Sequence, residues 1–281
     1  MGFLNKIVSG GQTGADRAAL DFAINFNIPH GGWISKGRRT EAGPLPDVYN
    51  LKEMDSTDYP ARTRQNILDS DGTVIIARGP LTGGSALTHE FALRTGKNVC
   101  SINLLEQDTF EASLILHDFL LDQGIHVLNV AGPRASHDPD IYYDVKTILT
   151  TALYLDFLET QENEIQEELW QTDQMIDQHF DFPKDFTSIK QATDALEQSL
   201  TLRGKILIAR SQTCQMADIY FTFLEYVRSS LSLDEYNSNL FKFLSKGRTL
   251  KEYTPEDAVM DLLKELKNQL SPQFKLRVVS S

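Results

Sequence analysis

The stretch from Ile7 to Ala23, IVSGGQTGADRAALDFA, decides the fold class of this chain of 281 residues. Its first residues end an apolar run over 3–9 that predicts a short β-strand. Alanine, leucine and phenylalanine at helical spacing then predict a helix over 15–27. A glycine-rich turn joins the two, so the stretch has the pattern of a strand, a tight turn and a helix, which opens a βα unit.

The same alternation continues to about residue 155. Further strands are predicted at 71–77, 98–104 and 125–131, and helices at 85–95, 110–123 and 141–158. Strands that alternate with helices of about 10–15 residues are typical of parallel βαβ units. The sequence therefore predicts an α/β domain over 1–155, a Rossmann-like three-layer α/β/α sandwich around a parallel sheet.

The character of the sequence changes after residue 155. Most glycines and prolines lie before this point, and acidic stretches with helical spacing follow it. Helices are predicted at 159–181, 186–198, 202–230, 234–244 and 254–270. We therefore expect an acidic, all-α C-terminal domain over 156–281. Two roles stay open for it: a helical extension that packs on the sheet, or an effector and oligomerisation domain.

Composition restricts the classes of function. The net charge is −12, from 27 basic and 39 acidic side chains. An acidic chain is a poor ligand for duplex nucleic acid, which is bound through Lys and Arg at phosphates. Two cysteines cannot build a disulfide framework, and no apolar run is long enough to span a membrane. We expect a cytoplasmic, homo-oligomeric protein that binds neither duplex nucleic acid nor membrane.

The glycine-rich turn is the first candidate ligand site. Glycines let the backbone approach a ligand closely, and the helix that follows offers free N–H groups and the positive end of its dipole to an oxyanion. The turn lacks the Gly-Lys-Ser/Thr of a phosphate-binding P-loop, and Ser9 replaces the first glycine of the dinucleotide pattern G-x-G-x-x-G. A tight turn that only packs helix on strand is the alternative. The candidate ligand-binding residues are Gly10, Gly11, Gln12, Thr13, Gly14 and Asp16.

Two further glycine-containing loops follow the strands predicted at 71–77 and 125–131. A basic cluster, Lys36, Arg38 and Arg39, lies in the chain between the first predicted helix and the strand at 71–77. The carboxyl ends of parallel strands meet at one edge of a sheet, so these loops would face one crevice. Arginine pairs with phosphate through two parallel hydrogen bonds. The alternatives are that Ser85 only caps its helix and that the basic loop is only a solvated surface loop. The further candidates are Thr82, Gly83, Gly84, Ser85, Gly132, Arg134, Lys36, Arg38, Arg39 and Arg62.

Metal-binding patterns are missing from the sequence. The six histidines form no H-x-x-x-H pair, and Cys100 and Cys214 lie too far apart for a C-x-x-C motif. Zinc sites depend on such spacings. We predict no preformed metal site, and Cys100, inside a predicted strand, is expected to be a core residue.

Five sequence blocks together resemble a known family. The blocks are IVSGGQTGADRAALDFA (7–23), GGWISKGRRTEAGPLP (31–46), RTRQNILDSDGTVII (62–76), LTGGSALT (81–88) and LNVAGPRASHDPDIY (128–142). In this order they resemble the putative molybdenum carrier protein family, a branch of the SLOG superfamily of Rossmann-like nucleotide-binding domains, over about residues 4–155. The resemblance implies binding of molybdenum cofactor or a related oxyanion. Ile34-Ser35 stands where many relatives have Cys-Pro, which removes a thiolate ligand.

The same superfamily contains lysine-decarboxylase-like phosphoribohydrolases with the loop P-G-G-x-G-T-x-x-E. The chain keeps Gly83, Gly84 and Glu90 of this pattern but has Ala86-Leu87 for the inner Gly-Thr. The resemblance leaves three functions to distinguish. We favour a binding protein for a phosphate-bearing, nucleotide-like ligand or molybdenum cofactor, without catalysis. The alternatives are a nucleotide N-glycosidase with Glu90 as its acid/base group, and a sensor of a nucleotide signal with a helical effector domain.

Overall fold

The computed structural model describes residues 4–163, 175–183, 185–211, 216–235, 238–250 and 252–274. Contacts within the chain divide it into two compact units, Met1–Asn163 and Glu164–Ser281. The first unit ends with helix α5 (Ile141–Asn163), and the boundary predicted at 155/156 falls inside this helix.

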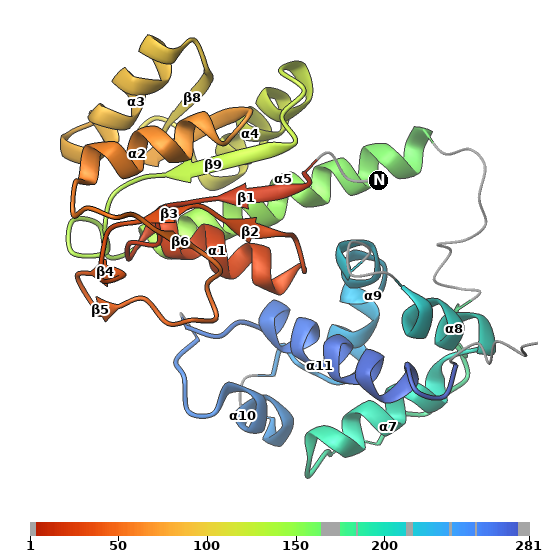
Figure 1. Cartoon of the computed structure of the whole chain (residues 1–281). Helices are drawn as coiled ribbons and strands as arrows, with labels where there is room; N and C mark the ends of the chain where they lie inside the picture. The colour runs from red at the N-terminus through yellow and green to blue at the C-terminus, as the bar shows by residue number, and fades with distance from the viewer. Residues whose placement is uncertain are drawn as a thin grey trace, which may run out of the picture. The chain divides into compact units, whose positions relative to one another are not determined.

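A five-stranded sheet forms the centre of the first unit (Figure 1). Its strands are β1 (Lys6–Val8), β2 (His30–Gly31), β7 (Gly72–Ala77), β8 (Asn98–Asn103) and β9 (Val127–Ala131). The order across the sheet is β2-β1-β9-β7-β8, and every neighbouring pair is parallel. The predicted parallel sheet is therefore confirmed.

Helices cover both faces of this sheet. On one side, α1 (Ala15–Asn25) and α4 (Thr109–Asp122) both contact α5. On the other side, α2 (Tyr59–Leu68) contacts α3 (Gly83–Thr95). Figure 1 shows the sheet between these two groups of helices. The three-layer α/β/α architecture expected from the sequence is thus present.

Burial explains why these segments take their structure. All six residues of β7 are buried, as expected for a β-branched run in a central strand that is covered on both faces. On α1, the alanines at positions 15, 18, 19 and 23 are fully buried. Such small side chains let the helix lie close to the sheet and to α5.

The order of the strands places β9, the last in the chain, at the centre of the sheet, between β1 and β7. If the strands are counted cyclically from β9, the order becomes 3-2-1-4-5, as in the Rossmann fold. Ligands of such sheets bind outside the carboxyl ends of the strands, at the point where the order reverses. Here that switch point lies between β9 and β7.

An irregular segment separates β2 from α2. It contains two small sheets, one pairing β3 (Trp33–Ile34) with β6 (Lys52–Glu53) and one pairing β4 (Arg39–Thr40) with β5 (Gly43–Pro44). Strands of two residues carry no periodicity, and β4, β5 and β6 were not predicted. The segment is held by a small apolar cluster, made by Leu20, Ile34, Leu45, Tyr49 and Leu51.

Regular secondary structure in the described part of the second unit is helical apart from one isolated bridge, between Ile176 and Leu200. Its helices are α7 (Ile189–Ser199), α8 (Leu202–Arg210), α9 (Met216–Ser230), α10 (Asn239–Ser245) and α11 (Pro255–Leu270). The capping box of α11 pairs the Thr254 and Asp257 side chains with each other's backbone N–H groups. The expected all-α C-terminal region is confirmed in these ranges.

Three details of that helix prediction need correction. The helix predicted over 159–181 is observed only as the end of α5; residues 164–174 lie outside the described part, and 176–183 are not helical. The stretch 202–230 forms two helices, since α8 ends before α9 begins, and α10 begins at Asn239 rather than at 234. None of the helices in the described ranges has the length and hydrophobicity needed to cross a lipid bilayer.

Candidate functional site

A cavity of about 700 Å³ opens at the carboxyl ends of β7 and β9. It lies at the switch point of the sheet, and its volume is within the range of small-molecule sites. The loops after β1, β7 and β9 line it together with α2 and the first turns of α3. Its walls include the side chains of Asp16, Tyr59, Arg62, Asn66, Arg78, Thr82, Ser85, Leu87, Thr88, Asn129, Arg134, His137 and Asp138.

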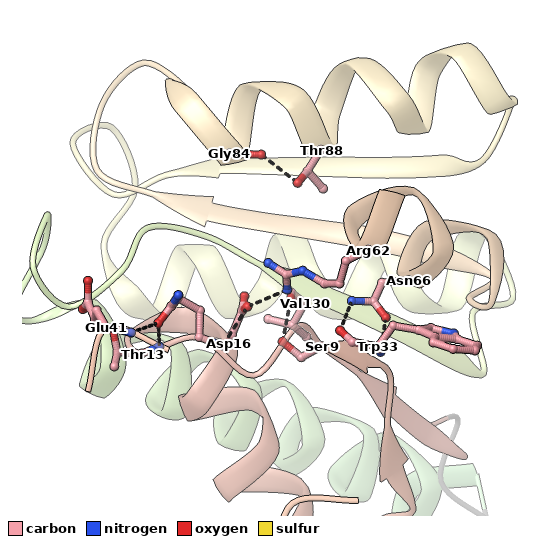
Figure 2. Close-up of polar contacts among 11 residues, drawn as sticks. Ser9, Thr13, Asp16, Trp33, Glu41, Arg62, Asn66, Gly84, Thr88 and Val130 are labelled. Atoms are coloured by element: carbon pink, nitrogen blue, oxygen red, sulfur yellow. Dashed lines mark hydrogen bonds and ion pairs between the residues drawn. The ribbon is translucent and has the colours of Figure 1, made fainter. Parts of the chain in front are cut away.

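A buried ion pair between Arg62 and Asp16 forms one wall of the cavity (Figure 2). Arg62 reaches down from α2, and its Nη1 lies 3.3 Å from Oδ2 of Asp16 at the start of α1. The two side chains are only 6% and 10% exposed. Gly10 makes room for the pair, because a Cβ at that position would lie 1.1 Å from Nη1 of Arg62.

Hydrogen bonds and the ion pair offset only part of the cost of burying these two charges. Burial raises the pKa of Asp16, against the opposing effects of the Arg62 charge and of the hydrogen bond from the Gln12 N–H. The Arg62 guanidinium also lies over the Tyr59 ring, with Cζ 4.2 Å from its centroid. Yet Nε of Arg62 is buried without a hydrogen-bond partner in the described structure. Since a guanidinium carries five N–H donors, Arg62 can serve a further acceptor.

The N-terminus of α3 forms another wall. Thr82 precedes the helix, its side chain makes no capping hydrogen bond, and no acidic residue lies in the first turn. Gly83 and Gly84 are exposed there. The first N–H groups of a helix and its dipole favour an anion at this end. Arg134 adds a positive charge to the same cavity, with Cζ 5.3 Å from the Tyr59 ring centroid.

The N-terminus of α1, by contrast, is filled by the chain itself. The Gln12 N–H donates to Asp16, the Thr13 N–H to the Gln12 side chain, and the Ala15 N–H to the carbonyl of Pro133. A Cβ at Gly14 would lie 2.5 Å from that same carbonyl oxygen. The N–H groups of the glycine turn therefore bind the loop after β9 and the Asp16 carboxylate, both of which belong to the chain.

Glu41 ties three loops together beside the cavity. Its carboxylate accepts hydrogen bonds from the hydroxyls of Thr13 and Ser136 and from the Ser136 N–H, while its own N–H donates to the Gln12 side chain. Desolvation alone would raise the pKa of Glu41, but the hydrogen bonds from Ser136 and Thr13 lower it below the usual value. Glu41 thus fixes the positions of the loops after β1 and β9.

Arg78, directly after β7, is engaged by two carboxylates. Its Nε lies 3.2 Å from Oδ2 of Asp138 and its Nη2 lies 2.5 Å from Oδ2 of Asp144. These contacts hold the loop after β7 to the loop after β9 and to α5. Most of the charge of Arg78 is therefore neutralised within the protein.

The structure brings about half of the predicted ligand-binding residues into this cavity. Those that line it are Gly10, Asp16, Arg62, Thr82, Gly83, Gly84, Ser85, Gly132 and Arg134. Outside its lining lie Gly11, Gln12, Thr13, Gly14, Lys36, Arg38 and Arg39, and also Glu90, the candidate acid/base group. Their part in ligand binding stays a prediction in either case.

Arg38 and Glu90 have partners of their own. The Arg38 guanidinium donates to the backbone carbonyls of Leu45, Pro46, Tyr49 and Leu51, at 2.8–3.1 Å, and so organises the irregular segment after β2. Lys36 and Arg39 are exposed. Glu90, on the exposed side of α3, pairs with Arg94 one helical turn later at 2.5 Å.

Several lining residues were not found from the sequence. Tyr59 and Arg78 lie beside predicted elements without a motif, and Thr88 and Asn129 lie within an expected helix and strand. A polar residue inside an apolar strand is the one signal available, since Asn129 interrupts 127–131 and is buried against the Thr73 hydroxyl at 3.1 Å. The tyrosine carries no such signal.

The described ranges contain no cluster of three or more His, Cys, Asp or Glu side chains arranged to hold a metal ion. Cys100 is partly buried in β8, and burial raises the pKa of its thiol to about 11. The thiol is therefore protonated at neutral pH and is a poor metal ligand.

Comparison with known proteins places this unit in a family. Residues 7–153, more than half of the chain, match the model of the circularly permutated YpsA SLOG family. A crystal structure titled putative molybdenum carrier protein, from Syntrophus aciditrophicus, is 49% identical and superposes with a TM-score of 0.53, over 54% of this chain and 96% of that chain. No curated protein matches the chain.

These comparisons agree with the topology and with the resemblance found in the sequence. A cyclic renumbering of the strands restores the Rossmann order, as a circular permutation would. The matched range also contains every cavity-lining residue. The chain belongs to the circularly permutated YpsA SLOG family.

Proposed function

We propose that the cavity between β7 and β9 binds a phosphate-bearing, nucleotide-like small molecule. The observation that carries this proposal is the meeting of two incomplete donors in one cavity: the buried Arg62, whose Nε lacks an acceptor, and the uncapped N-terminus of α3. An oxyanion in the cavity is a suitable acceptor for the Arg62 guanidinium and for the first N–H groups of α3. Ala77, Pro80 and Leu87 give the same cavity apolar surface for a ring system.

Molybdenum cofactor is a member of this ligand class. The name of the Syntrophus aciditrophicus protein suggests a molybdenum carrier, and we extend that suggestion to this chain as a proposal. The cofactor would be cargo, held by its phosphate and its ring. The donors of the cavity wall suit such a ligand better than a bare metal ion, because they are arginine and backbone N–H groups.

Binding without catalysis is favoured over N-glycosidase activity. General acid–base catalysis needs a carboxylate within hydrogen-bond reach of the reacting centre. Glu90, the candidate from the sequence, is absent from the cavity lining and is paired with Arg94. A role of the second unit as effector, homo-oligomerisation and a cytoplasmic location remain predictions.

Calorimetric titration and mass spectrometry test the proposal. The purified full chain is titrated with AMP, GMP, inorganic phosphate, molybdate and molybdopterin, and small molecules that co-purify with it are identified by mass. We expect heat from at least one phosphate-bearing ring compound. Arg134→Ala should weaken that binding about tenfold, the cost of one charge-assisted contact.

Arg94→Ala is the matched control, because Arg94 lies on α3 outside the cavity lining. It should leave the affinity unchanged. The proposal is rejected if none of the compounds produces heat and no phosphate-bearing molecule co-purifies. Equal losses of affinity in the two variants would also contradict it, since the effect would then come from surface charge in general.

A further inference from the structure

We infer that Asp16 is a specificity-determining residue of the cavity: its carboxylate occupies Arg62 and thereby restricts the ligand to one that carries a single phosphate group. This inference rests on the proposed function. A negatively charged side chain is thereby part of a site for an anion.

Three arginines line the cavity, but two of them are already paired by carboxylates of the chain. Arg78 is held by Asp138 and Asp144, and Arg62 is held by Asp16. Arg134 has no ion pair among the described residues, although its charge helps to lower the pKa of Glu41. Asp16 and Asp138 themselves line the cavity. Among the side chains that line the cavity, three arginines and two carboxylates leave one net positive charge for a ligand; Asp144, which also holds Arg78, lies outside the lining.

A polyphosphate ligand would meet repulsion at this site. Each added phosphate brings further negative charge, and the cavity lining supplies no lysine to neutralise it. Asp16 is buried, so its charge is weakly screened by water and salt. Charges of like sign placed together at a binding site cost several kcal/mol.

Asp16 is fixed where this repulsion acts. It accepts a hydrogen bond from the Gln12 N–H at 3.2 Å, and Gly10 leaves the space in which Arg62 meets it. The carboxylate cannot move away without losing both contacts. A ligand phosphate can share Arg62 through its remaining donors, while a second phosphate group would have to displace Asp16.

Titrations with AMP, ADP and ATP test the inference, with ionic strength held constant and without Mg²⁺, which would mask the phosphate charge. In the wild-type chain we expect AMP to bind most tightly and ATP most weakly. In Asp16→Asn, the affinity for ADP relative to AMP should rise about tenfold, because Arg62 loses its carboxylate partner and is then available to the second phosphate group. Asp118→Asn, an exposed carboxylate on α4 that does not line the cavity, is the matched control and should leave the ratio unchanged.

A double variant separates an effect through Arg62 from a general loss of negative charge. In Asp16→Asn/Arg62→Gln the pair is removed together, and the gain for ADP should disappear. If Asp16→Asn does not fold, as checked by circular dichroism, the wild-type order of affinities still decides. The inference is overturned if wild type binds ATP more tightly than AMP, or if Asp16→Asn leaves the ADP/AMP ratio unchanged. Absence of binding for all three nucleotides would instead count against the proposed function.

Discussion

Replacing Gly10 by alanine is the most direct test of the buried pair. Gly10 does not need a left-handed backbone, since its φ is not among the positive values of the chain. The substitution therefore acts through its added methyl group alone. That methyl would lie 1.1 Å from Nη1 and 2.3 Å from Cζ of Arg62, and 2.8 Å from Oδ2 of Asp16. The guanidinium must leave, and Asp16 then stays buried without its cation.

The expected cost follows from the burial of both partners. Breaking a buried ion pair by removing one partner destabilises a protein by about 3–5 kcal/mol. Here Arg62 is not deleted, and it can turn toward the cavity and water, so we expect a loss near the lower end, about 3 kcal/mol. For a domain of this size that loss lowers the melting temperature by roughly 6–12 °C.

Unfolding in urea, followed by tryptophan fluorescence, measures this loss. Gly84→Ala is the control, because a Cβ there meets only Cε1 of Tyr59 at 3.8 Å, an ordinary contact. In an Arg62→Met background, whose side chain can turn away, Gly10→Ala should cost less than in the wild type, and the difference isolates the clash. If Gly10→Ala in the wild-type background lowers the free energy of unfolding by less than about 0.5 kcal/mol, the scatter of neutral substitutions, the reasoning is refuted.

Three further substitutions test other parts of the site. Arg38→Ala should lower the free energy of unfolding by about 2–4 kcal/mol in urea titrations, since it removes four bonds to carbonyls, whereas the exposed Arg39→Ala should change it by less than about 0.5 kcal/mol. Glu41→Gln should remove the stability that the carboxylate contributes, which is less than about 1 kcal/mol for an exposed group. Because the pKa of Glu41 is lowered in the folded state, this contribution is present above about pH 4.3 and is lost as pH falls through the folded pKa. Urea midpoints measured at several pH values should therefore depend less on pH in Glu41→Gln than in the wild type. Gly132→Ala should prevent soluble expression or destabilise by more than Gly10→Ala, because its Cβ would lie 2.4 Å from the Ile76 carbonyl oxygen, which cannot turn away; equal stabilities of the two variants would contradict this.

The main elements of the sheet domain could be predicted because their apolar residues follow local patterns. The strand expected at 71–77 is β7, whose β-branched residues are buried on both faces, and the helix expected at 85–95 is α3, which begins at Gly83. The strand order could not be predicted, because no local pattern records that β9 pairs with both β1 and β7. The two-residue strands after β2 depend on contacts such as those of Arg38, which are also not local.

The sequence indicated which loops form the candidate site, but it did not indicate which side chains pair with one another there. A glycine turn before a helix indicates a place for an anion, and the sequence could not show that Asp16, four residues after Gln12, supplies that anion from within the chain. Arg62 is 46 positions from Asp16, and their pairing depends on the packing of α2 over the sheet. The N-terminus of α3 was recognised from the same kind of pattern, and there no side chain caps the helix.

The central position of β9 has a consequence for how the protein is made. Until Val127–Ala131 has been synthesised, β1 with β2 and β7 with β8 are separate pairs of strands with no shared hydrogen bonds. Each pair then presents, besides its permanent outer edge, the edge that β9 covers in the complete sheet, and an unpaired edge is a template for aggregation. A nascent chain that stalls before residue 127 should therefore depend on chaperones, and truncated genes that end there should yield insoluble products, whereas a chain that includes β9 can close its sheet in a single step.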